Sequence, residues 1–337
     1  MLNFDEQRFL RIQSGAVALV DPLHQAITAD LQSGRGNIFF LGTGGAAILM
    51  MPAVQLLQRR SGFPAFLESS AEIVLTGHHA LGPQSIVVIP SLSGTTKESI
   101  AALEFCKAKG AKVYTLIGHG GTPLDVQADR SFINFAEDDT SCESFYLQSL
   151  AIAVSIMSAR GEIDDFASIA DQITRLPGLL IEVKRGFEGK AEQVAETLKD
   201  ETYHIITGSG STWPEAFYYG MCILEEMQWI RTRPVHASDF FHGTLELVET
   251  GVSVLLFKGE DETRPVAERV EAFVPTVSNK LQVFDTAAFD LPGISPEVRA
   301  LISPVILATI FERVSAHLEV KRNHPLTTRR YYKRVAY

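Results

Sequence analysis

Cysteine is scarce in this sequence, and its scarcity excludes two kinds of architecture. Only three cysteines, Cys106, Cys142 and Cys222, occur among 337 residues. An odd number without close spacing suits neither a disulfide framework nor a zinc site. We therefore expect three buried thiols and no bound metal.

The sequence also lacks long apolar runs and an excess of positive charge. No window reaches the roughly eighteen unbroken apolar residues of a membrane helix, and residues 1–11 contain acids and bases instead of a signal-peptide core. The 30 Lys and Arg residues against 40 Asp and Glu residues give a formal net charge of −10. These features predict a soluble cytoplasmic protein and argue against nucleic acid or an anionic membrane as its main partner.

What the chain contains instead is a repeated unit of apolar strand, small-residue turn and helix. The unit begins at "NIFFLGTGG", recurs at "SIVVIPSLSGTT" and restarts at "YHIITGSGSTWPEA". Apolar strands that alternate with helices indicate parallel sheets covered on both faces, and the length fits two domains. The sequence therefore predicts two copies of one α/β fold. The predicted segments are a helical N-terminal segment (1–30), a first domain (31–165), a helical connector (166–196), a second domain (197–320) with a final helix (305–318), and a tail (321–337).

Two of the small-residue turns have the composition of a phosphate-binding loop. The turn "SLSGTT" contains Ser91, Ser93 and Thr96 and precedes a helix, so its hydroxyls and N–H groups lie at a helix N-terminus. Helix capping alone also explains a single hydroxyl there, but three hydroxyls around one glycine favour a bound anion. The turn "GTGG" resembles part of a dinucleotide-binding loop, and the sequence has no G-x-x-x-x-G-K-[ST] motif. A small phosphorylated ligand therefore fits better than a nucleotide.

Two polar side chains in the second half have the chemistry of a proton-transfer pair. Glu226 lies between Ile223 and Ile230 on a helix-like segment, so we expect a desolvated carboxylate with a raised pKa that takes and returns a proton. His242, flanked by aromatic residues and a glycine, has the titration range of a general acid. The alternatives are a solvated glutamate, which we expect for Glu225, and a structural histidine.

Together these motifs resemble the sugar isomerase (SIS) family, which includes the isomerase domain of glucosamine-6-phosphate synthase. The resemblance covers residues 30–337 and rests on the two α/β halves, on "SLSGTTKES" and "GSGS", and on a glutamate followed sixteen residues later by His-Gly. Within the family, the segments "FFHGTLELVETGV", "LLFKGEDETRPVAERVEAFV" and "NHPLTTRRYYKRVAY" look like those of fructosamine-6-phosphate deglycases. The resemblance implies two tandem SIS domains, each a parallel sheet between helical layers, and no cofactor.

The resemblance also implies roles for individual residues. It makes Glu226 the base that moves a proton between C1 and C2, and His242 the acid that opens the sugar ring or protonates oxygen. The remaining implied positions are the phosphate binders Ser91, Ser93 and Thr96, the substrate contacts Gly42, Thr43, Gly44 and Ser141, and a candidate catalytic lysine at Lys333. For the lysine, a solvated charge on the tail is the alternative.

The sequence departs from the family pattern at two positions. Relatives have a proline where Thr244 follows His-Gly, which predicts a less rigid loop in this chain. The synthase has a lysine one helical turn before its glutamate, where this chain has Ile223. The second departure weakens the assignment as an amino-sugar synthase.

By this resemblance the protein is expected to be a deglycase that cleaves a 6-phosphorylated Amadori compound to glucose 6-phosphate and an amine. Glu226 would form a 1,2-enaminol and then an imine, which water hydrolyses. Family members are dimers or larger, so we expect a homo-oligomer in which His242 acts in its own or the neighbouring subunit. Two alternatives stay open: a phosphosugar isomerase or amino-sugar-phosphate deaminase that uses the same glutamate, and a non-catalytic sugar-phosphate sensor.

Overall fold

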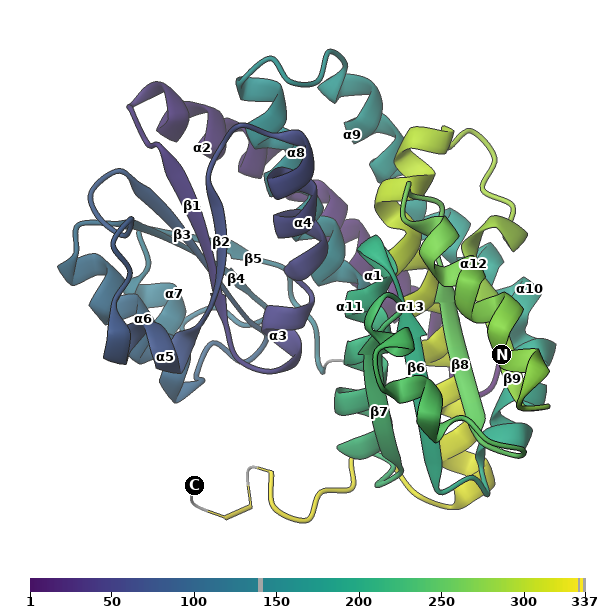
Figure 1. The fold of residues 1–337 in the computed structure, drawn as a ribbon. Coiled ribbons are helices and arrows are strands. Elements are labelled where there is room, and N and C mark those ends of the chain that lie inside the picture. Colours follow the sequence, from purple (N-terminus) through teal and green to yellow (C-terminus); the bar gives the residue numbers. More distant parts are fainter. Residues whose placement is uncertain (139–141, 333, 336–337) are drawn as a thin grey trace. The chain divides into compact units, whose positions relative to one another are not determined.

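The computed structural model describes residues 1–138, 142–332 and 334–335, which form two compact units. One unit is Glu6–Pro177, and the other combines Met1–Asp5 with Gly178–Tyr337. Each unit contains a parallel β-sheet with helices on both faces (Figure 1). The predicted α/β class with two parallel sheets is therefore confirmed.

The sheet of the first unit has five strands in the order β2-β1-β3-β4-β5, and every neighbouring pair is parallel. Its strands are β1 (Asn37–Gly42), β2 (Ala65–Ser69), β3 (Ser85–Ser91), β4 (Lys112–Ile117) and β5 (Arg130–Ile133). Its helices are α1 (Glu6–Ala18), α2 (Val20–Gln32), α3 (Gly45–Ile48), α4 (Met51–Arg60), α5 (Ser70–Thr76), α6 (Lys97–Ala108), α7 (Pro123–Gln127), α8 (Glu143–Ala159) and α9 (Phe166–Thr174).

The apolar strands of the first unit supply a core on each face of the sheet. Phe39 and Leu41 of β1 pack with Leu103 of α6 on one face, where α5 and α7 also lie (Figure 1). The opposite face is covered by α8 together with α2 and α4. Residues 143–157 of α8 are all buried, which explains why its apolar residues are not confined to one side of the helix.

The sheet of the second unit has four parallel strands in the order β7-β6-β8-β9. Its strands are β6 (Tyr203–Gly208), β7 (Arg231–His236), β8 (Ser253–Lys258) and β9 (Leu281–Asp285). Its helices are α10 (Leu176–Leu198), which starts at the end of the first unit, α11 (Trp213–Tyr218), α12 (Arg264–Phe273) and α13 (Pro296–Arg322). Shorter helical turns are η1 (Gly210–Thr212), η2 (Tyr219–Glu225), η3 (Asp239–Phe241), η4 (Thr244–Leu247), η5 (Val274–Thr276) and η6 (Thr286–Ala288).

The final helix is longer than its apolar pattern predicts. Helix α13 begins at Pro296, nine positions before the predicted start, because Ser295 caps it and proline suits a first helical position. The Ser295 hydroxyl accepts a hydrogen bond from the N–H of Val298 at 3.3 Å. Among the described residues, α13 alone is long and apolar enough to cross a membrane, but 89% of its most apolar window is buried in the structure. It is the core helix of the second unit.

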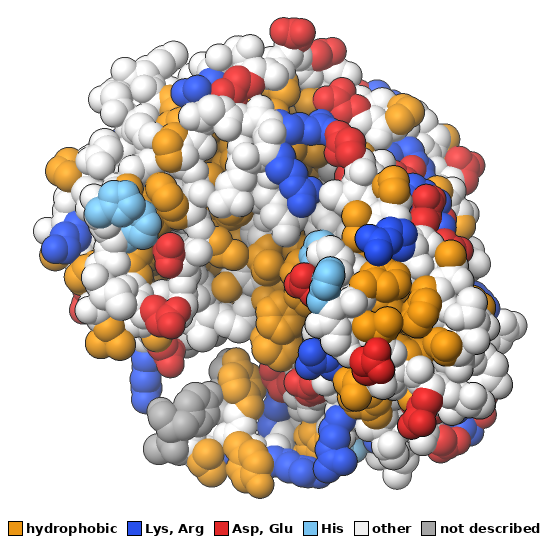
Figure 2. Space-filling view, viewed as in Figure 1, with side chains coloured by type: hydrophobic (Ala, Val, Ile, Leu, Met, Phe, Trp, Pro, Cys, Tyr) orange, Lys and Arg blue, Asp and Glu red, His pale blue; other side chains and the backbone are white. Residues whose placement is uncertain are grey.

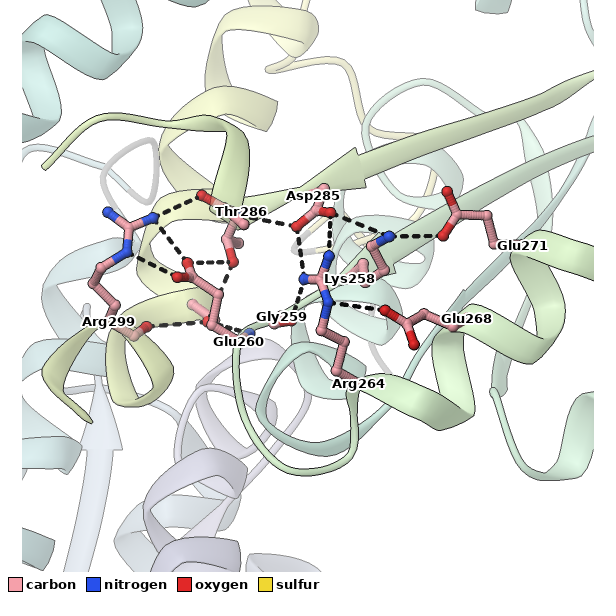
Figure 3. Close-up of polar contacts among 11 residues, drawn as sticks. Lys258, Gly259, Glu260, Arg264, Glu268, Glu271, Asp285, Thr286 and Arg299 are labelled. Carbon is pink, nitrogen blue, oxygen red and sulfur yellow. Dashed lines mark hydrogen bonds and ion pairs between the residues drawn. The ribbon is translucent and has the colours of Figure 1, made fainter. Parts of the chain in front are cut away.

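A network of ion pairs joins α12 and α13 to the ends of β8 and β9 (Figure 3). Arg264 of α12 contacts both oxygens of Asp285 at 2.9 and 2.6 Å, and Lys258 reaches the same carboxylate at 3.1 Å. Arg299 of α13 contacts both oxygens of Glu260 at 2.8 and 2.9 Å. Bidentate arginine–carboxylate pairs fix orientation as well as charge, so the network sets the positions of both helices on the sheet.

Residues 1–5 are anchored in the second unit, although α1 belongs to the first. Leu2 donates its N–H to Glu188 Oε1 at 2.7 Å, and its carbonyl accepts from Arg313 Nη2 at 2.5 Å. Glu188 also accepts from Arg313 Nε at 2.8 Å and lies 3.0 Å from His317 Nε2. Burial alone would raise the pKa of Glu188, but these partners outweigh burial and lower the pKa to about 2.

Candidate active site

The two small-residue loops of the first unit follow neighbouring strands. Strand β1 lies between β2 and β3. The connection after β1 therefore runs to one side of the sheet and the connection after β3 runs to the other. Ligands of open α/β sheets bind in the crevice at such a switch point, outside the carboxyl ends of the strands. The loops after β1 and β3, which contain Gly42–Gly44 and Ser91–Thr96, are therefore the loops that border this crevice.

The hydroxyls of the loop after β3 bond to each other and to the loop backbone. Ser91 Oγ accepts from the N–H of Gly94 at 3.2 Å and lies 3.2 Å from Thr96 Oγ1. Ser93 Oγ accepts from both the N–H and the hydroxyl of Thr95, at 3.3 and 3.1 Å. Thr96 is the N-cap residue of α6, but its side chain makes no capping hydrogen bond. The hydroxyls therefore shape the loop, and capping by Thr96 is not what orders it.

Gly94 allows this loop to pack against the loop after β4. Its φ angle is 65°, which favours glycine, and a Cβ atom there would lie 2.1 Å from Thr122 Oγ1. The carbonyl of Gly94 accepts from the N–H of Leu124 at 3.2 Å. Any larger residue at position 94 would push these two loops apart.

The loop after β1 is a tight turn with an exposed tip. A Cβ atom on Gly42 would lie 2.8 Å from the Cα of Ala47, so only glycine fits. Gly44 has φ 58° and is the N-cap residue of α3, and both Thr43 and Gly44 are exposed. This loop can therefore offer backbone groups and the hydroxyl of Thr43 to a ligand.

In the second unit, the segment before Glu226 is helical, as predicted, but its last part is a π-helix. Residues 219–225 form η2, and the N–H of Glu226 bonds to the carbonyl of Met221 at 3.1 Å, five residues earlier. Gly220 makes the close approach that accompanies this wider turn, because a Cβ atom there would lie 2.8 Å from Pro234 of β7. Single π-turns inside helices often occur at functional sites.

Adjacent carboxylates at the end of this helix have different surroundings. Glu225 is exposed, and its Oε1 accepts from the N–H and hydroxyl of Thr232 at 3.2 and 2.6 Å. Glu226 is half-buried, with 29% of its side chain exposed, and its Oε1 lies 2.9 Å from Arg329 Nε. A guanidinium therefore lies beside the carboxylate that the sequence places between Ile223 and Ile230, and such a partner favours the charged form of a carboxylate.

His242 follows the helical turn η3 and has an exposed side chain. Gly243 has φ 136°, which favours glycine, so the loop turns sharply directly after the histidine. Thr244 is only 2% exposed, and its hydroxyl accepts from Arg233 Nε at 3.1 Å. This hydrogen bond anchors the loop directly after the His-Gly pair, where the resemblance predicts a less rigid loop.

Two predicted positions, Ser141 and Lys333, lie outside the described residues. Thr95, which shares the hydroxyl cluster, was not predicted as a site residue. The pair of threonines in "SLSGTT" is a signal for Thr95. For Arg329 the sequence suggests either a contact with a substrate carboxylate or a structural pairing, and the structure pairs it with Glu226. Arg329 and Glu226 are 103 positions apart in the sequence (329 − 226), and no local sequence pattern predicts that they pair.

The described residues contain no group of three or more His, Cys, Asp or Glu side chains able to hold a metal ion. Cys106 and Cys222 are buried as expected, and burial raises the pKa of Cys106 to about 12. The prediction of three buried thiols is wrong for Cys142, which is half-buried just before α8.

Comparison with known proteins places this geometry in a family. Residues 31–158 match the family model described as the SIS domain. This match covers the part of the chain that contains the five strands of the first sheet. Solved structures extend the match: a crystal structure described as a candidate phosphosugar isomerase from Bacillus subtilis covers 96% of this chain and 99% of its own, with TM-score 0.87 and 29% identity.

Two curated proteins that are similar to the chain over almost their whole length are deglycases by name. The chain is 28% identical to the fructosamine deglycase FrlB of Bacillus subtilis, over 96% of this chain and 100% of that protein. It is 25% identical to the fructoselysine 6-phosphate deglycase of Escherichia coli O157:H7, over 97% and 93% of the two chains. The family resemblance predicted from the sequence is therefore confirmed.

Proposed function

We propose that the protein is a deglycase that cleaves a fructosamine 6-phosphate into glucose 6-phosphate and an amine. The observation that carries the proposal is the half-buried carboxylate of Glu226, placed at the end of a π-helical turn in a chain that is similar to two deglycases along their whole length. In this proposal the phosphate binds at the loop of Ser91, Ser93 and Thr96, beside Gly42–Gly44 at the switch point. The N-terminus of α6 adds N–H donors there.

The proposed chemistry needs one base, one acid and water. Glu226 removes a proton from C1 of the open-chain sugar, which gives a 1,2-enaminol, and returns the proton to C2, which leaves an imine at C1. Water adds to the imine, and the C1–N bond breaks to release the amine and glucose 6-phosphate. The nitrogen of the substrate delocalises charge during these steps, so no cofactor is required, and His242 exchanges protons at oxygen.

The test is Glu226→Gln, with Glu225→Gln as the matched control on the adjacent exposed carboxylate. Because general acid–base steps are typically worth about 10² to 10⁴ in rate, Glu226→Gln should lose at least about 10²-fold in turnover while it still binds substrate. Glu225→Gln should keep near-normal turnover. Release of amine and of glucose 6-phosphate is measured with a phosphorylated Amadori compound. Near-normal turnover of Glu226→Gln would sink the assignment.

A second candidate, a phosphosugar isomerase, is favoured by the description of the similar Bacillus subtilis structure. An isomerase would use the same proton transfer between C1 and C2 without imine hydrolysis. Interconversion of an aldose and a ketose 6-phosphate, with no amine released from the Amadori compound, would select this candidate. In either case we propose a cytoplasmic protein, in line with the acidic composition. The proposal of a homo-oligomer rests on the family resemblance alone.

A further inference from the structure

The C-terminal tail contacts the candidate base and the residues that follow it. Arg329 pairs with Glu226, and two residues later the Gln228 Nε2 donates to the carbonyl of His324 at 2.8 Å. The guanidinium of Arg330 lies 3.8 Å from the ring centroid of Trp229, the residue that follows Gln228. The backbone of Met227 also bonds to His324. Residues 226–229 therefore all contact residues 324–330, and the tail is held in register along the end of the helix.

The residue at the centre of these contacts has an unusual backbone. Trp229 has φ 56°, a left-handed conformation that is rare for a bulky residue and carries strain. Its side chain is 37% exposed and is contacted by Arg330 and by the ring of His324 at 4.5 Å. Strained residues persist where the surrounding structure holds them, and they cluster at ligand sites. The tail is part of what holds Trp229.

Arg329 itself is held by the tail and only loosely by the carboxylate. Its Nη1 donates to the carbonyls of Leu326 and Thr328 at 2.6 and 2.9 Å, and the side chain is 15% exposed. Its Nε lies 2.9 Å from Glu226 Oε1, yet this contact lacks the angles of a hydrogen bond. The hydrogen bonds to the tail carbonyls thus fix the guanidinium, which attracts Glu226 by charge. Another carboxylate can replace Glu226 without breaking those hydrogen bonds.

The composition of the tail fits an anionic group on the substrate. Residues 321–337 contain six Lys and Arg and no Asp or Glu, in a chain whose net charge is −10. Figure 2 shows blue and orange side chains along the described part of this tail, at the bottom of the view. A base that stays paired with a guanidinium is a poorer proton acceptor, because the pairing stabilises its charged form.

We propose that Arg329 is a specificity-determining residue that pairs with Glu226 in the absence of substrate and with a carboxylate of the amine half when substrate is bound. When the substrate carboxylate takes this guanidinium, the charged form of Glu226 loses one source of stabilisation, which favours uptake of the C1 proton, so the preferred substrates are those made from amino acids. This proposal rests on the proposed deglycase function. It assigns Arg329 to the amine half of the substrate, whereas the loop of Ser91 and Thr96 binds the phosphate.

The test compares two fructosamine 6-phosphates, one made from glycine, which carries a carboxylate, and one made from methylamine, which does not. Charged hydrogen bonds are typically worth enough to change affinity by about tenfold or more. We expect the wild type to prefer the glycine compound by at least about tenfold in kcat/KM. Arg329→Gln should lose that preference, chiefly through a higher KM for the glycine compound, and Arg329→Lys should retain part of it.

The matched control is Arg330→Gln, which removes the same charge from the neighbouring tail residue and should keep the preference ratio. Equal losses on both substrates in Arg329→Gln would overturn the proposal, because Arg329 would then act only on Glu226. Calorimetric binding of both compounds in a Glu226→Gln background separates this inference from the proposed function. Absence of amine release by the wild type overturns the deglycase, whereas an unchanged binding preference in Arg329→Gln overturns the role of Arg329.

Discussion

At the scale of single residues, the chemical type of each candidate site residue was predictable from the sequence, but the side chains that it contacts were not. The hydroxyl loop and the distinction between Glu226 and Glu225 were anticipated from spacing, and the structure gives these two carboxylates different surroundings. The ion pair of Glu226 with Arg329 was not anticipated, because it depends on how the tail folds back. The hydrogen bond from Arg233 to Thr244 was not anticipated either, because it depends on how the loop after β7 folds back onto that strand.

Thr96 offers a residue-scale test of the phosphate loop. Thr96→Ala removes a hydroxyl that lies 3.2 Å from Ser91 Oγ, at the N-terminus of α6. Because a phosphate contact is made in the ground state and the transition state alike, KM should rise by about tenfold with little change in kcat. Steady-state kinetics measure the split, and Thr96→Ser should restore most of the affinity. A fall in kcat alone would contradict a binding role.

His204 makes stability depend on pH. It is fully buried on β6, its Nδ1 lies 2.8 Å from Ser253 Oγ, and burial lowers its pKa from 6.5 to about 4. Below pH 6.5 the imidazole of His204 is protonated in the unfolded chain but stays neutral in the folded state. The free energy of unfolding therefore falls as pH drops from 6.5 towards 4. The loss between pH 7 and pH 5 should be about 2 kcal/mol from this residue.

The measurement is urea unfolding of the wild type and of His204→Asn at both pH values. The variant is expected to be less stable at pH 7, since a buried ring is lost, but its stability should change less between pH 7 and pH 5. Parallel pH profiles for the two proteins would show that another group is responsible.

At the scale of elements, the helices and strands were predictable because apolar periodicity and turn residues define them. The π-helical turn η2 was not, because the choice between i+4 and i+5 bonding is made by tertiary packing, here by the close approach of Gly220 to Pro234. The early start of α13 was missed although Ser295 and Pro296 supply the local signals for a helix N-terminus. Capping signals outside an apolar pattern are easily underweighted.

Gly220→Ala tests the packing that accompanies the π-turn. Alanine gains about 1 kcal/mol in helix propensity, but its Cβ would meet Pro234 at 2.8 Å and Thr232 at 3.0 Å. Overpacking typically costs about 1–3 kcal/mol, so the net effect should be destabilising, and kcat should fall as Glu226 shifts. The control is Gly189→Ala in α10, where a Cβ meets nothing within 4 Å and stability should rise. Thermal unfolding and turnover are measured for both; a stabilised, fully active Gly220→Ala would refute the packing argument.

At the scale of the whole molecule, the duplication visible in the sequence corresponds to two parallel sheets with related strand orders. The hydroxyl loop follows a strand of the first sheet, whereas Glu226 and His242 belong to the second unit. Sequence reasoning reached this division because strand–turn–helix units repeat. It could not decide whether one chain suffices, since subunit contacts leave no periodic pattern.

Complementation tests whether two chains share one site. Glu226→Gln and His242→Ala are purified separately, each with little activity, and then mixed under conditions that exchange subunits. If His242 acts on a neighbouring subunit, mixed dimers contain one site with both intact residues, and activity should recover to about a quarter of wild type. No recovery, with exchange verified by mass, would place both residues in the same chain.

The anchoring of residues 1–5 bears on the order in which the protein folds. Leu2 bonds to Glu188 and Arg313, which lie 186 and 311 positions later in the chain. Because synthesis proceeds from the N-terminus, the partners of these first residues are made only when most of the chain has been synthesised. Residues Glu6–Pro177, in contrast, already contain all five strands of their own sheet. The first unit can therefore fold on the ribosome, while the second is completed last, by closing a loop that spans almost the entire chain.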